Sequence, residues 1–295
     1  MPSIILVTGA STGIGQLTAR TLAARGHVVY ASMRDIAGRN APRVRELRDW
    51  AFARGHDLRA IELDVLSQAS ADRAVAAIVA EQGRLDVVVH NAGHLVVGPT
   101  EAFTPEEMAA TFDTNVLGSQ RVNKSALPVL RGQGSGLLLW VSSTTVRGGF
   151  PPFMGPYAAA KAAMDSLAVT MSYELSRFGI ETAIVVPGAF TKGTAHFPNA
   201  GRPSDAATVA AYARYDGLMD QVGTRLSALM PEDADPQAVA DRIADIVAFP
   251  AGQRPFRTMV DFIDDGATAV TEVAERVRVD FARRIGIDDL LAPSV

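Results

Sequence analysis

The sequence predicts an α/β protein with a doubly wound, parallel, seven-stranded sheet that carries helices on both faces. Three observations predict this class. Short runs rich in valine, isoleucine and leucine alternate along the chain with longer stretches of helical period. Some runs are apolar at every position, as at Val87, Val88 and Val89, which is typical of strands covered on both sides. A glycine-rich turn joins the first apolar run to the first helical stretch.

The predicted elements follow one another in βαβ order. Strands are expected where β-branched and other apolar residues dominate, at 4–8, 27–33, 58–64, 85–90, 136–142, 180–186 and 256–260. Helices are expected where apolar residues recur at helical spacing, at 13–25, 42–54, 67–82, 104–130, 157–178 and 236–249. Right-handed crossovers then give the strand order 3-2-1-4-5-6-7, with a ligand crevice at the carboxyl ends of the strands.

Two of the helices carry clear start or stop signals. Ser67 can cap the third helix and Gly83 can end it. The fourth helix begins with Thr104 as cap and Pro105 in the first turn. Glu107 stands three residues after this cap, as a capping box requires.

We expect residues 1–295 to form a single domain, since doubly wound α/β domains reach this length. The segment 189–235 breaks the regular alternation with prolines, glycines and aromatic residues. It is predicted to be a mobile lid over the site, and the alternative is a helical surface excursion. Residues 264–295 are predicted to form a charged, amphipathic, helical tail.

Composition excludes several classes of function. The chain is 48% hydrophobic and 20% charged, which is ordinary for a soluble globular protein. It has no cysteine, which excludes disulfides, thiol nucleophiles and cysteine-ligated metals. A net charge of −4 gives no general attraction to nucleic acid or to an anionic membrane. No apolar run predicts a signal peptide or a membrane span, so a cytoplasmic location is expected.

The glycines after the first strand predict a dinucleotide site. Gly9, Gly13 and Gly15 permit a tight turn and a close approach of backbone to a pyrophosphate. The N–H groups at the start of the following helix face that anion. A lone glycine triplet would be weak support, but here a strand precedes it and a helix follows.

Tyr157 and Lys161 form a candidate acid–base pair. They stand four residues apart in a helical stretch, so they share one face, and the chain has only three lysines. A phenol with an ordinary pKa near 10 is a poor base at neutral pH. We expect the lysine ammonium and an oxidised nicotinamide to lower the pKa of Tyr157 in a water-poor crevice. Tyr157 would then take a proton from an alcohol or give one to a carbonyl.

Seven motifs occur in a characteristic order over about residues 3–190. They are Thr8-Gly9-x-x-x-Gly13-x-Gly15, Asp64-Val65, Asn91-Ala92-Gly93, Asn115, Ser142-Ser143, Tyr157-x-x-x-Lys161 and Pro187-Gly188. Together they resemble the short-chain dehydrogenase/reductase family, and residues 29–35 and 155–157 are most similar to its branch of 17β-hydroxysteroid and retinol dehydrogenases.

This resemblance implies a Rossmann fold and a catalytic set of Asn115, Ser143, Tyr157 and Lys161. Asn115 would hold a water of the proton relay, and Lys161 would also bind the nicotinamide ribose. The cofactor-binding residues that it implies are Gly9, Ser11, Thr12, Gly13, Ile14, Gly15, Asp64, Val65, Asn91, Ala92, Gly93, Tyr157, Lys161, Pro187, Gly188 and Thr191. The helices at 104–130 and 157–178 are commonly the family's subunit interface, so a homodimer or homotetramer is expected.

The end of the second strand predicts NADP(H) as the cofactor. An NAD enzyme needs a carboxylate there for the ribose 2′-hydroxyl, whereas a 2′-phosphate attracts arginine. Met33 occupies the carboxylate position and Arg34 follows it, with Ser11 or Thr12 expected near the phosphate. The alternative is that Arg34 is one of several solvated arginines and is neutralised by Asp35.

Three hydroxyl residues are candidates for holding the substrate oxygen. The family commonly places this serine thirteen residues before the tyrosine, a spacing that falls on Thr144. We choose Ser143 and expect a one-residue insertion at 148–152, with Ser142 and Thr144 as alternatives. Thr191 follows Pro187 by four residues rather than the usual five. His90 and His94 lack the helical context of a zinc pair, and no metal site is predicted.

These observations predict an oxidoreductase that moves a hydride between NADP(H) and an alcohol or carbonyl substrate. Apolar residues between 150 and 197 favour a hydrophobic secondary alcohol or ketone. Two other classes remain as alternatives: a dinucleotide-binding regulator without turnover, and an isomerase or lyase on the same fold. The intact glycine loop and the retained tyrosine and lysine disfavour both alternatives.

Overall fold

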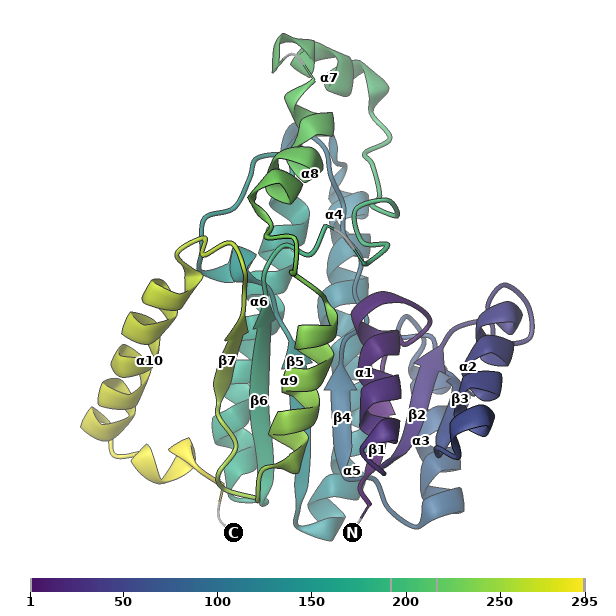
Figure 1. Ribbon diagram of the computed structural model, residues 1–295. Helices are drawn as coiled ribbons and strands as arrows, with labels where there is room; N and C mark the ends of the chain where they lie inside the picture. The colour runs from purple at the N-terminus through teal and green to yellow at the C-terminus, as the bar shows by residue number, and fades with distance from the viewer. Residues whose placement is uncertain (1, 192, 216, 294–295) are drawn as a thin grey trace.

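A seven-stranded parallel sheet lies at the centre of the protein in a computed structural model, which describes residues 2–191, 193–215 and 217–293 (Figure 1). The strands are β1 Ile4–Val7, β2 Val28–Met33, β3 Leu58–Glu62, β4 Val87–His90, β5 Gly136–Val141, β6 Ile180–Pro187 and β7 Arg257–Val260. Their order is β3-β2-β1-β4-β5-β6-β7 and every neighbouring pair is parallel. The predicted sheet and its strand order are confirmed.

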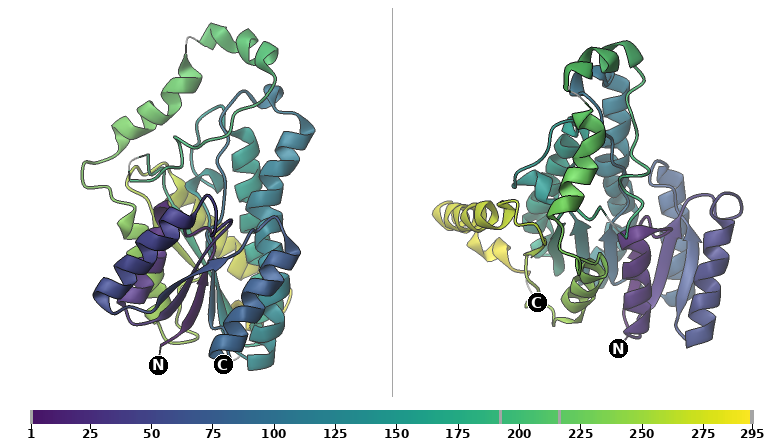
Figure 2. Two further views of the ribbon diagram at one scale, coloured as in Figure 1. Left: turned by 90° about the vertical axis from the view of Figure 1, so that its right-hand side faces the viewer. Right: turned by 45° about the horizontal axis from the view of Figure 1, so that its top comes forward.

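Helices cover both faces of this sheet. The α-helices of the described residues are α1 Gly13–Ala24, α2 Ala41–Arg54, α3 Gln68–Gln82, α4 Pro105–Phe112, α5 Gly118–Gln133, α6 Gly155–Ser176, α7 Ala206–Ala211, α8 Leu218–Leu229, α9 Gln237–Ala248 and α10 Ala267–Arg284. Helices α1, α2 and α9 lie on one face, and α3, α5 and α6 lie on the other (Figure 2). The predicted doubly wound architecture is therefore confirmed.

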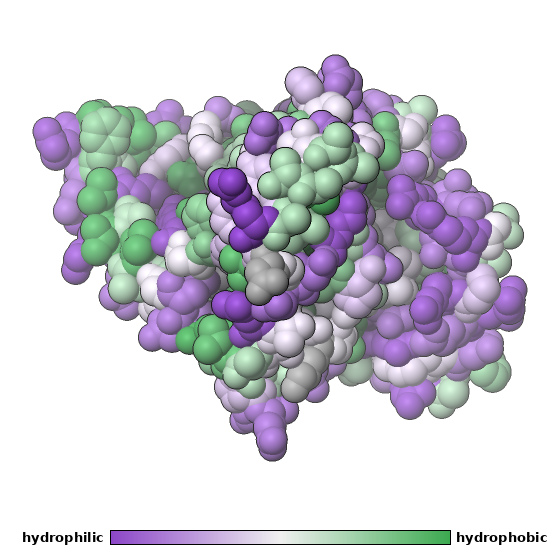
Figure 3. Space-filling model, turned by 90° about the horizontal axis from the view of Figure 1, so that it is seen from above, coloured by the Kyte–Doolittle hydropathy of each residue, from purple (hydrophilic) through white to green (hydrophobic). Residues whose placement is uncertain are grey.

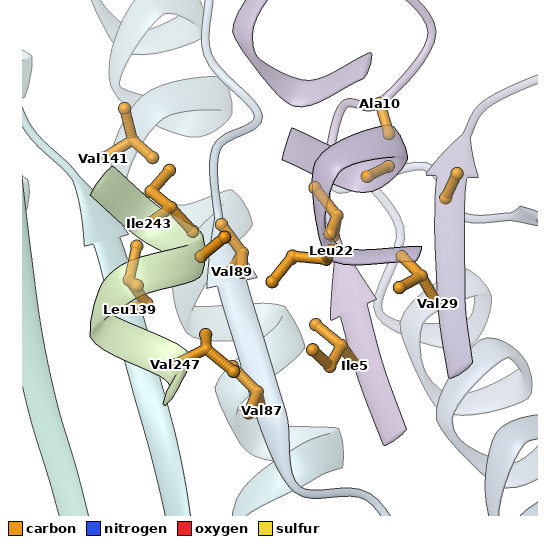
Figure 4. Packing of buried hydrophobic residues seen from close by; sticks show 14 of the residues in the cluster. Ile5, Ala10, Leu22, Val29, Val87, Val89, Leu139, Val141, Ile243 and Val247 are labelled. Carbon is orange, nitrogen blue, oxygen red and sulfur yellow. The ribbon is translucent and has the colours of Figure 1, made fainter. Parts of the chain in front are cut away.

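Each face of the sheet buries its own apolar cluster. On the α1 and α9 side, Ile5 and Val89 of the sheet pack with Leu22 and Ile243 of the helices, all fully buried (Figure 4). Trp140 is a core residue of the opposite cluster. Burying a large apolar side chain contributes about 1.5–3 kcal/mol. The resulting rigid sheet fixes the loops at the carboxyl ends of its strands.

The predicted caps are present. The Ser67 hydroxyl accepts a hydrogen bond from Ser70 N at 3.2 Å, and Gly83 ends α3 at a φ of +74°. Thr104 Oγ1 accepts from Glu107 N at 3.2 Å, while Glu107 Oε2 accepts from Thr104 N at 3.0 Å. This reciprocal pair is the predicted capping box.

The single helix predicted at 104–130 is wrong in one respect. A π-helical turn, Asp113–Leu117, separates α4 from α5. Such a turn widens the helix by one residue and is frequent at functional sites. The spacing of apolar residues in the sequence does not reveal that one turn of the helix is wider by one residue. The turn contains Asn115, one of the predicted catalytic residues.

The irregular segment 189–235 stands above the carboxyl ends of the strands and contains α7 and α8 (Figure 1). Its mobility as a lid stays a prediction. At the far side of β7, the tail forms the predicted helix as α10. Within the described ranges, no helix combines the length and apolarity that crossing a bilayer requires.

Candidate active site

The glycine loop after β1 has no room for a side chain at Gly9 or Gly15. Gly9 adopts a φ of +64°, and a Cβ added to it would lie 2.8 Å from Ala92 Cα. A Cβ on Gly15 would lie 2.4 Å from the Gly9 carbonyl oxygen. Asn91 Nδ2 donates to the carbonyl oxygens of Thr8 at 2.9 Å and Gly9 at 3.1 Å. The loop after β4 therefore holds the loop after β1 in a fixed shape.

A continuous cavity of about 860 Å³ runs along the carboxyl ends of the strands. Most of the predicted site residues line it, namely Gly9, Ser11, Thr12, Gly13, Ile14, Gly15, Arg34, Asp64, Val65, Asn91, Ala92, Gly93, Ser143, Tyr157, Lys161, Pro187 and Gly188. Asn115 and Thr191 lie outside its wall, and Thr194 lines it instead. An elongated ligand in this cavity would pass from the end of β2, along the glycine loop, to Tyr157.

The end of β2 presents arginines to this cavity. Arg34 and Arg39 both line it, together with Met33 and Asn40. The carboxylate of Asp35 turns into its own loop, where Oδ2 accepts a hydrogen bond from Arg39 N at 2.7 Å. Asn40 Nδ2 donates to the Arg34 carbonyl oxygen and closes the same loop. The acidic side chain nearest to Arg34 in sequence is therefore engaged outside the cavity wall.

The three hydroxyl candidates after β5 differ in their partners. Ser142 Oγ donates to Asp165 Oδ2 at 2.7 Å and is buried. Thr144 is also buried, in a short 3₁₀ turn, and does not line the cavity. Ser142 and Ser143 both line the cavity. Ser143 Oγ accepts hydrogen bonds from Thr145 N at 3.3 Å and Thr145 Oγ1 at 2.9 Å, and it lies near enough to the phenol to lower the pKa of Tyr157. Of the three, Ser143 is the one placed beside Tyr157.

The pKa of Tyr157 is raised in the protein alone, and the lowered value expected beside an oxidised nicotinamide stays a prediction. Burial raises this pKa to about 12, and the hydrogen bond with Ser143 offsets only part of this effect. Lys161 Nζ donates to the Val141 carbonyl oxygen at 2.9 Å, and burial lowers the pKa of Lys161 to about 8. Desolvation is thus the largest influence on the pKa of the phenol.

Asn115 is fully buried and clamps the loop after β4. Its Nδ2 donates to the carbonyl oxygens of His94 at 3.0 Å and Thr111 at 2.9 Å, and its Oδ1 accepts from His94 N at 3.1 Å. A Cβ on Gly93 would lie 2.8 Å from Asn115 Oδ1 and 3.7 Å from Lys161 Nζ. Asn115 and Lys161 therefore flank the same glycine.

Two histidines stand at the Tyr157 end of the cavity. The His196 ring packs edge-to-face on Tyr157, with 5.6 Å between ring centroids, and His94 lines the same wall. Burial, together with the nearby charge of Lys161, lowers the pKa of His196 to about 4. His90 instead contacts Asn123 through Nε2 at 2.7 Å, away from His94. His196 is therefore neutral at pH 7.

Comparison with known families agrees with this geometry. The family described as short chain dehydrogenase matches residues 3–202, which is more than half of the chain. The chain belongs to the short-chain dehydrogenase/reductase family. The resemblance inferred from the seven motifs is thereby confirmed.

Individual short-chain dehydrogenases show how this chain relates to the family. It is 35% identical to the 3-ketodihydrosphingosine reductase of Bacteroides thetaiotaomicron over 65% of each chain. It is 34% identical to the 17-beta-hydroxysteroid dehydrogenase type 1 of Mus musculus over 64% of this chain and 54% of that protein. The solved actinorhodin polyketide ketoreductase with NADPH is 26% identical, with a TM-score of 0.72 over 90% of this chain and 97% of that one. The chain matches about half to two thirds of the two curated relatives.

Some cavity residues of this short-chain dehydrogenase were not predicted from the sequence as site residues. Arg39 and Asn40 line the β2 end, and His94, His196 and Asn199 line the Tyr157 end. Arg39 could have been predicted from its place in the loop 35–40, which follows β2 and folds back on the end of that strand. For His196 and Asn199 no local motif exists, because they reach the cavity from the segment 189–235.

Proposed function

We propose that the protein is an NADP(H)-dependent oxidoreductase that transfers a hydride between the nicotinamide and an alcohol or carbonyl substrate. One observation carries this proposal: the glycine loop after β1 and the Ser143, Tyr157 and Lys161 side chains line one continuous cavity. The residues present fit a dinucleotide, because a Cβ on Gly9 or Gly15 would collide with neighbouring atoms of the cradle. A hydrophobic secondary alcohol or ketone remains the proposed substrate class.

Each side chain at the Tyr157 end has a separate role in this proposal. A bound NADPH would supply the hydride that reduces the carbonyl carbon. Ser143 Oγ donates a hydrogen bond to the carbonyl oxygen, and Tyr157 donates the proton that this oxygen acquires. Lys161 carries a positive charge that binds the ribose hydroxyls and stabilises the phenolate left on Tyr157. Asn115 holds the loop after β4 in place and completes the proton relay.

The raised pKa of Tyr157 favours the reductive direction. A phenol with a pKa of about 12 is protonated at neutral pH, which is the form that donates a proton. Oxidation of an alcohol needs the phenolate, which requires a further positive charge beside the ring.

The Lys161 charge sets the alkaline limit of this reaction. Because Lys161 has a pKa of about 8, it is charged below that pH and loses its charge above it. We expect kcat/KM for ketone reduction to fall as the pH rises through about 8, while Tyr157 stays protonated. A profile of kcat/KM against pH, measured at saturating NADPH, checks this. A flat profile well above pH 8 would contradict the role given to Lys161.

Two arginines support NADP(H) over NAD(H). Arg34 and Arg39 line the β2 end of the cavity, and Asp35 is engaged in its own loop. The polyketide ketoreductase among the similar structures also carries NADPH. We propose that Arg34 and Arg39 bind the 2′-phosphate, with Ser11 or Thr12 as hydroxyl donors. Charged hydrogen bonds of this kind are worth about 1.5–3 kcal/mol each.

Replacing Arg34 by Asp tests this cofactor preference. We expect NADPH affinity to fall roughly tenfold to a hundredfold, because the new carboxylate repels the 2′-phosphate and suits a 2′-hydroxyl. The ratio of NADPH to NADH dissociation constants, measured by fluorescence titration, checks this. Arg45→Asp is the matched control, since Arg45 is exposed on α2 and does not line the cavity. Equal effects of the two variants would refute the assignment of Arg34.

Alanine variants at positions 142, 143 and 144 separate the three hydroxyl candidates. We expect Ser143→Ala to lower kcat by about a hundredfold without changing NADPH affinity, because it removes a donor to the reacting oxygen. Thr144→Ala should leave kcat within a few-fold of the wild type. Ser142→Ala should act mainly on stability, because Ser142 bonds to buried Asp165. The largest kcat loss at position 142 or 144 would overturn the choice of Ser143.

A reductase assay distinguishes the proposed function from its alternatives. NADPH consumption is followed through the near-ultraviolet absorbance of the reduced nicotinamide, with a panel of apolar ketones and aldehydes. A dinucleotide-binding regulator would bind NADPH with no turnover of any substrate. An isomerase or lyase would convert its substrate without net consumption of NADPH.

The proposal also includes a homodimer or homotetramer and a cytoplasmic location.

A further inference from the structure

Three polar side chains stand at the Tyr157 end of the cavity and take no part in the proposed hydride transfer. They belong to His94, His196 and Asn199, which line this end. Asn199 N donates to the Ala195 carbonyl oxygen at 3.0 Å, so Asn199 and His196 lie in one tight turn. A substrate bound at this end would meet these side chains as well as the proton donor.

The segment that carries His196 is attached to the protein on both sides of this turn. It lies over the middle of the molecule seen from above, where hydrophilic and hydrophobic side chains are mixed (Figure 3). Before the turn, Thr194 Oγ1 donates to the Phe190 carbonyl oxygen at 3.0 Å. After the turn, Gly201 N donates to the Leu95 carbonyl oxygen at 2.9 Å, which joins the segment to the loop after β4. Together these bonds hold the histidine at this end of the cavity.

The contacts of the His196 ring are aromatic. The ring packs edge-to-face on Tyr157, with 5.6 Å between ring centroids, and on Phe197, with 6.5 Å. In the part of the chain that the structure describes, the two ring nitrogens form no hydrogen bond. The ring is partly buried and neutral, so it offers one N–H donor and one acceptor nitrogen. Because polar groups removed from water are nearly always paired, a partner for these nitrogens belongs in the cavity.

Large apolar side chains near the turn pack on one another instead of lining the cavity. Phe153, Met154 and Val222 are buried in one cluster, and Phe197 packs against them. None of these four lines the cavity, whereas Leu95 does. The part of a substrate that lies next to the histidine therefore meets ring nitrogens rather than a wall of large apolar side chains.

We propose that His196 determines specificity by hydrogen bonding to a hydroxyl on the carbon beside the reacting carbonyl, which makes the substrate an α-hydroxy ketone. This role rests on the proposed function, because the carbonyl oxygen must accept a proton from Tyr157. The rings of Tyr157 and His196 are in contact, so a carbonyl at the phenol places its neighbouring carbon beside the histidine. A hydroxyl both donates and accepts, and it can therefore pair with either nitrogen of a neutral ring. The rest of the substrate stays apolar.

Neither an unsubstituted ketone nor a keto acid fits these groups equally well. A purely apolar ketone leaves the ring nitrogens without a partner, which forfeits a hydrogen bond. A carboxylate needs a positively charged partner when it leaves water, and at a pKa of about 4 only about one His196 ring in a thousand is charged at pH 7. Lys161, the charged side chain nearby, serves the ribose hydroxyls and the phenolate in the proposed function. An uncharged hydroxyl matches the uncharged ring.

Three ketones that share a phenyl group test this role. Beside the carbonyl, acetophenone carries a methyl group, α-hydroxyacetophenone a hydroxymethyl group and benzoylformate a carboxylate. We expect kcat/KM with NADPH to be highest for α-hydroxyacetophenone. Because a hydroxyl also makes the neighbouring carbonyl more reactive by itself, the decisive measurement is how kcat/KM for each ketone changes when His196 is replaced. A kcat/KM for benzoylformate that exceeds both others and falls in a His196 variant would overturn the hydroxyl and indicate an anion site.

His196→Phe keeps an aromatic ring beside Tyr157 and removes both nitrogens. We expect it to lower kcat/KM for α-hydroxyacetophenone roughly tenfold, mainly through KM, and to leave the value for acetophenone within about twofold. His56→Phe is the matched control, because His56 lies between α2 and β3 and does not line the cavity. This control should change neither value.

The outcomes separate the role of His196 from the proposed function. If the ketones are reduced and His196→Phe lowers both values equally or not at all, the function stands and the hydroxyl role of His196 is refuted. If NADPH binds and neither these three ketones nor the apolar panel is reduced, the proposed function fails and the role of His196 fails with it.

Discussion

Replacing Tyr157 by Phe is expected to lower kcat for ketone reduction by about a thousandfold, within the 10²–10⁴ range of a positioned general acid. The substitution removes one hydroxyl and leaves the ring, so its edge-to-face contact with His196 is preserved. It also leaves the glycine cradle and the arginines at the end of β2 unchanged. The expected pattern is therefore a loss of turnover with unaltered NADPH affinity, measured by steady-state kinetics and by fluorescence titration.

A second variant distinguishes loss of the phenol hydroxyl from a change in the shape of the cavity. His196→Phe changes the ring that packs on Tyr157 but keeps the phenol hydroxyl, so it is expected to change KM more than kcat. If Tyr157→Phe keeps a tenth or more of the wild-type kcat, the hydroxyl is not the proton donor. If both variants lose NADPH affinity, they act through the shape of the cavity rather than through proton transfer.

The arrangement around Tyr157, the proposed proton donor, was predictable from the sequence only in part. The spacing of Tyr157 and Lys161, together with the strand and glycine motifs, predicts that both side chains meet in one crevice, and the structure places them on one cavity wall. The lowered phenol pKa expected beside an oxidised nicotinamide stays a prediction. Sequence spacing reveals which charges are near, but the desolvation that raises the pKa to about 12 depends on how tightly distant segments close over the ring.

The fold was more predictable than the edges of the site. Strand order follows from winding rules that act on local apolar runs, and the capping box at Thr104 is a purely local signal. The π-helical turn around Asn115 and the contact of His196 with Tyr157 are different. Each depends on packing between elements that are far apart in the chain. Neither the hydrophobic period nor the spacing of motifs can therefore predict it.

A buried ion pair beneath the site was also absent from the sequence-based predictions. Arg257 NH1 and NH2 donate to Asp165 Oδ2 at 2.6 Å and Oδ1 at 2.9 Å, and each side chain is only 3% exposed. Asp165 stands four residues after Lys161 on α6 and also accepts from Ser142. This pair therefore joins β7 to the helix and the strand end that carry the proposed catalytic residues.

Asp165→Ala is expected to lower the free energy of unfolding by about 3 kcal/mol, near the lower end of the range for breaking a buried pair. The lower end applies because Glu275 remains as a partner of the stranded Arg257. Urea denaturation measures the change. The matched control is Asp289→Ala, which breaks the exposed pair with Arg177 and should change the free energy of unfolding by about 0–1 kcal/mol. Similar losses in the two variants would contradict the importance of burial.

The pH dependence of this loss follows from the Asp165 carboxyl. Burial raises its pKa, but the hydrogen bonds and charge of Arg257 outweigh burial and hold the pKa below its ordinary value. A carboxyl with a depressed folded-state pKa stabilises the protein above its unfolded pKa of about 4, and this contribution is lost as the pH falls through the lower folded value. The difference in unfolding free energy between wild type and Asp165→Ala should therefore be full at pH 7 and shrink below about pH 4. A difference that grows on acidification would show that Asp165 is buried in its neutral form.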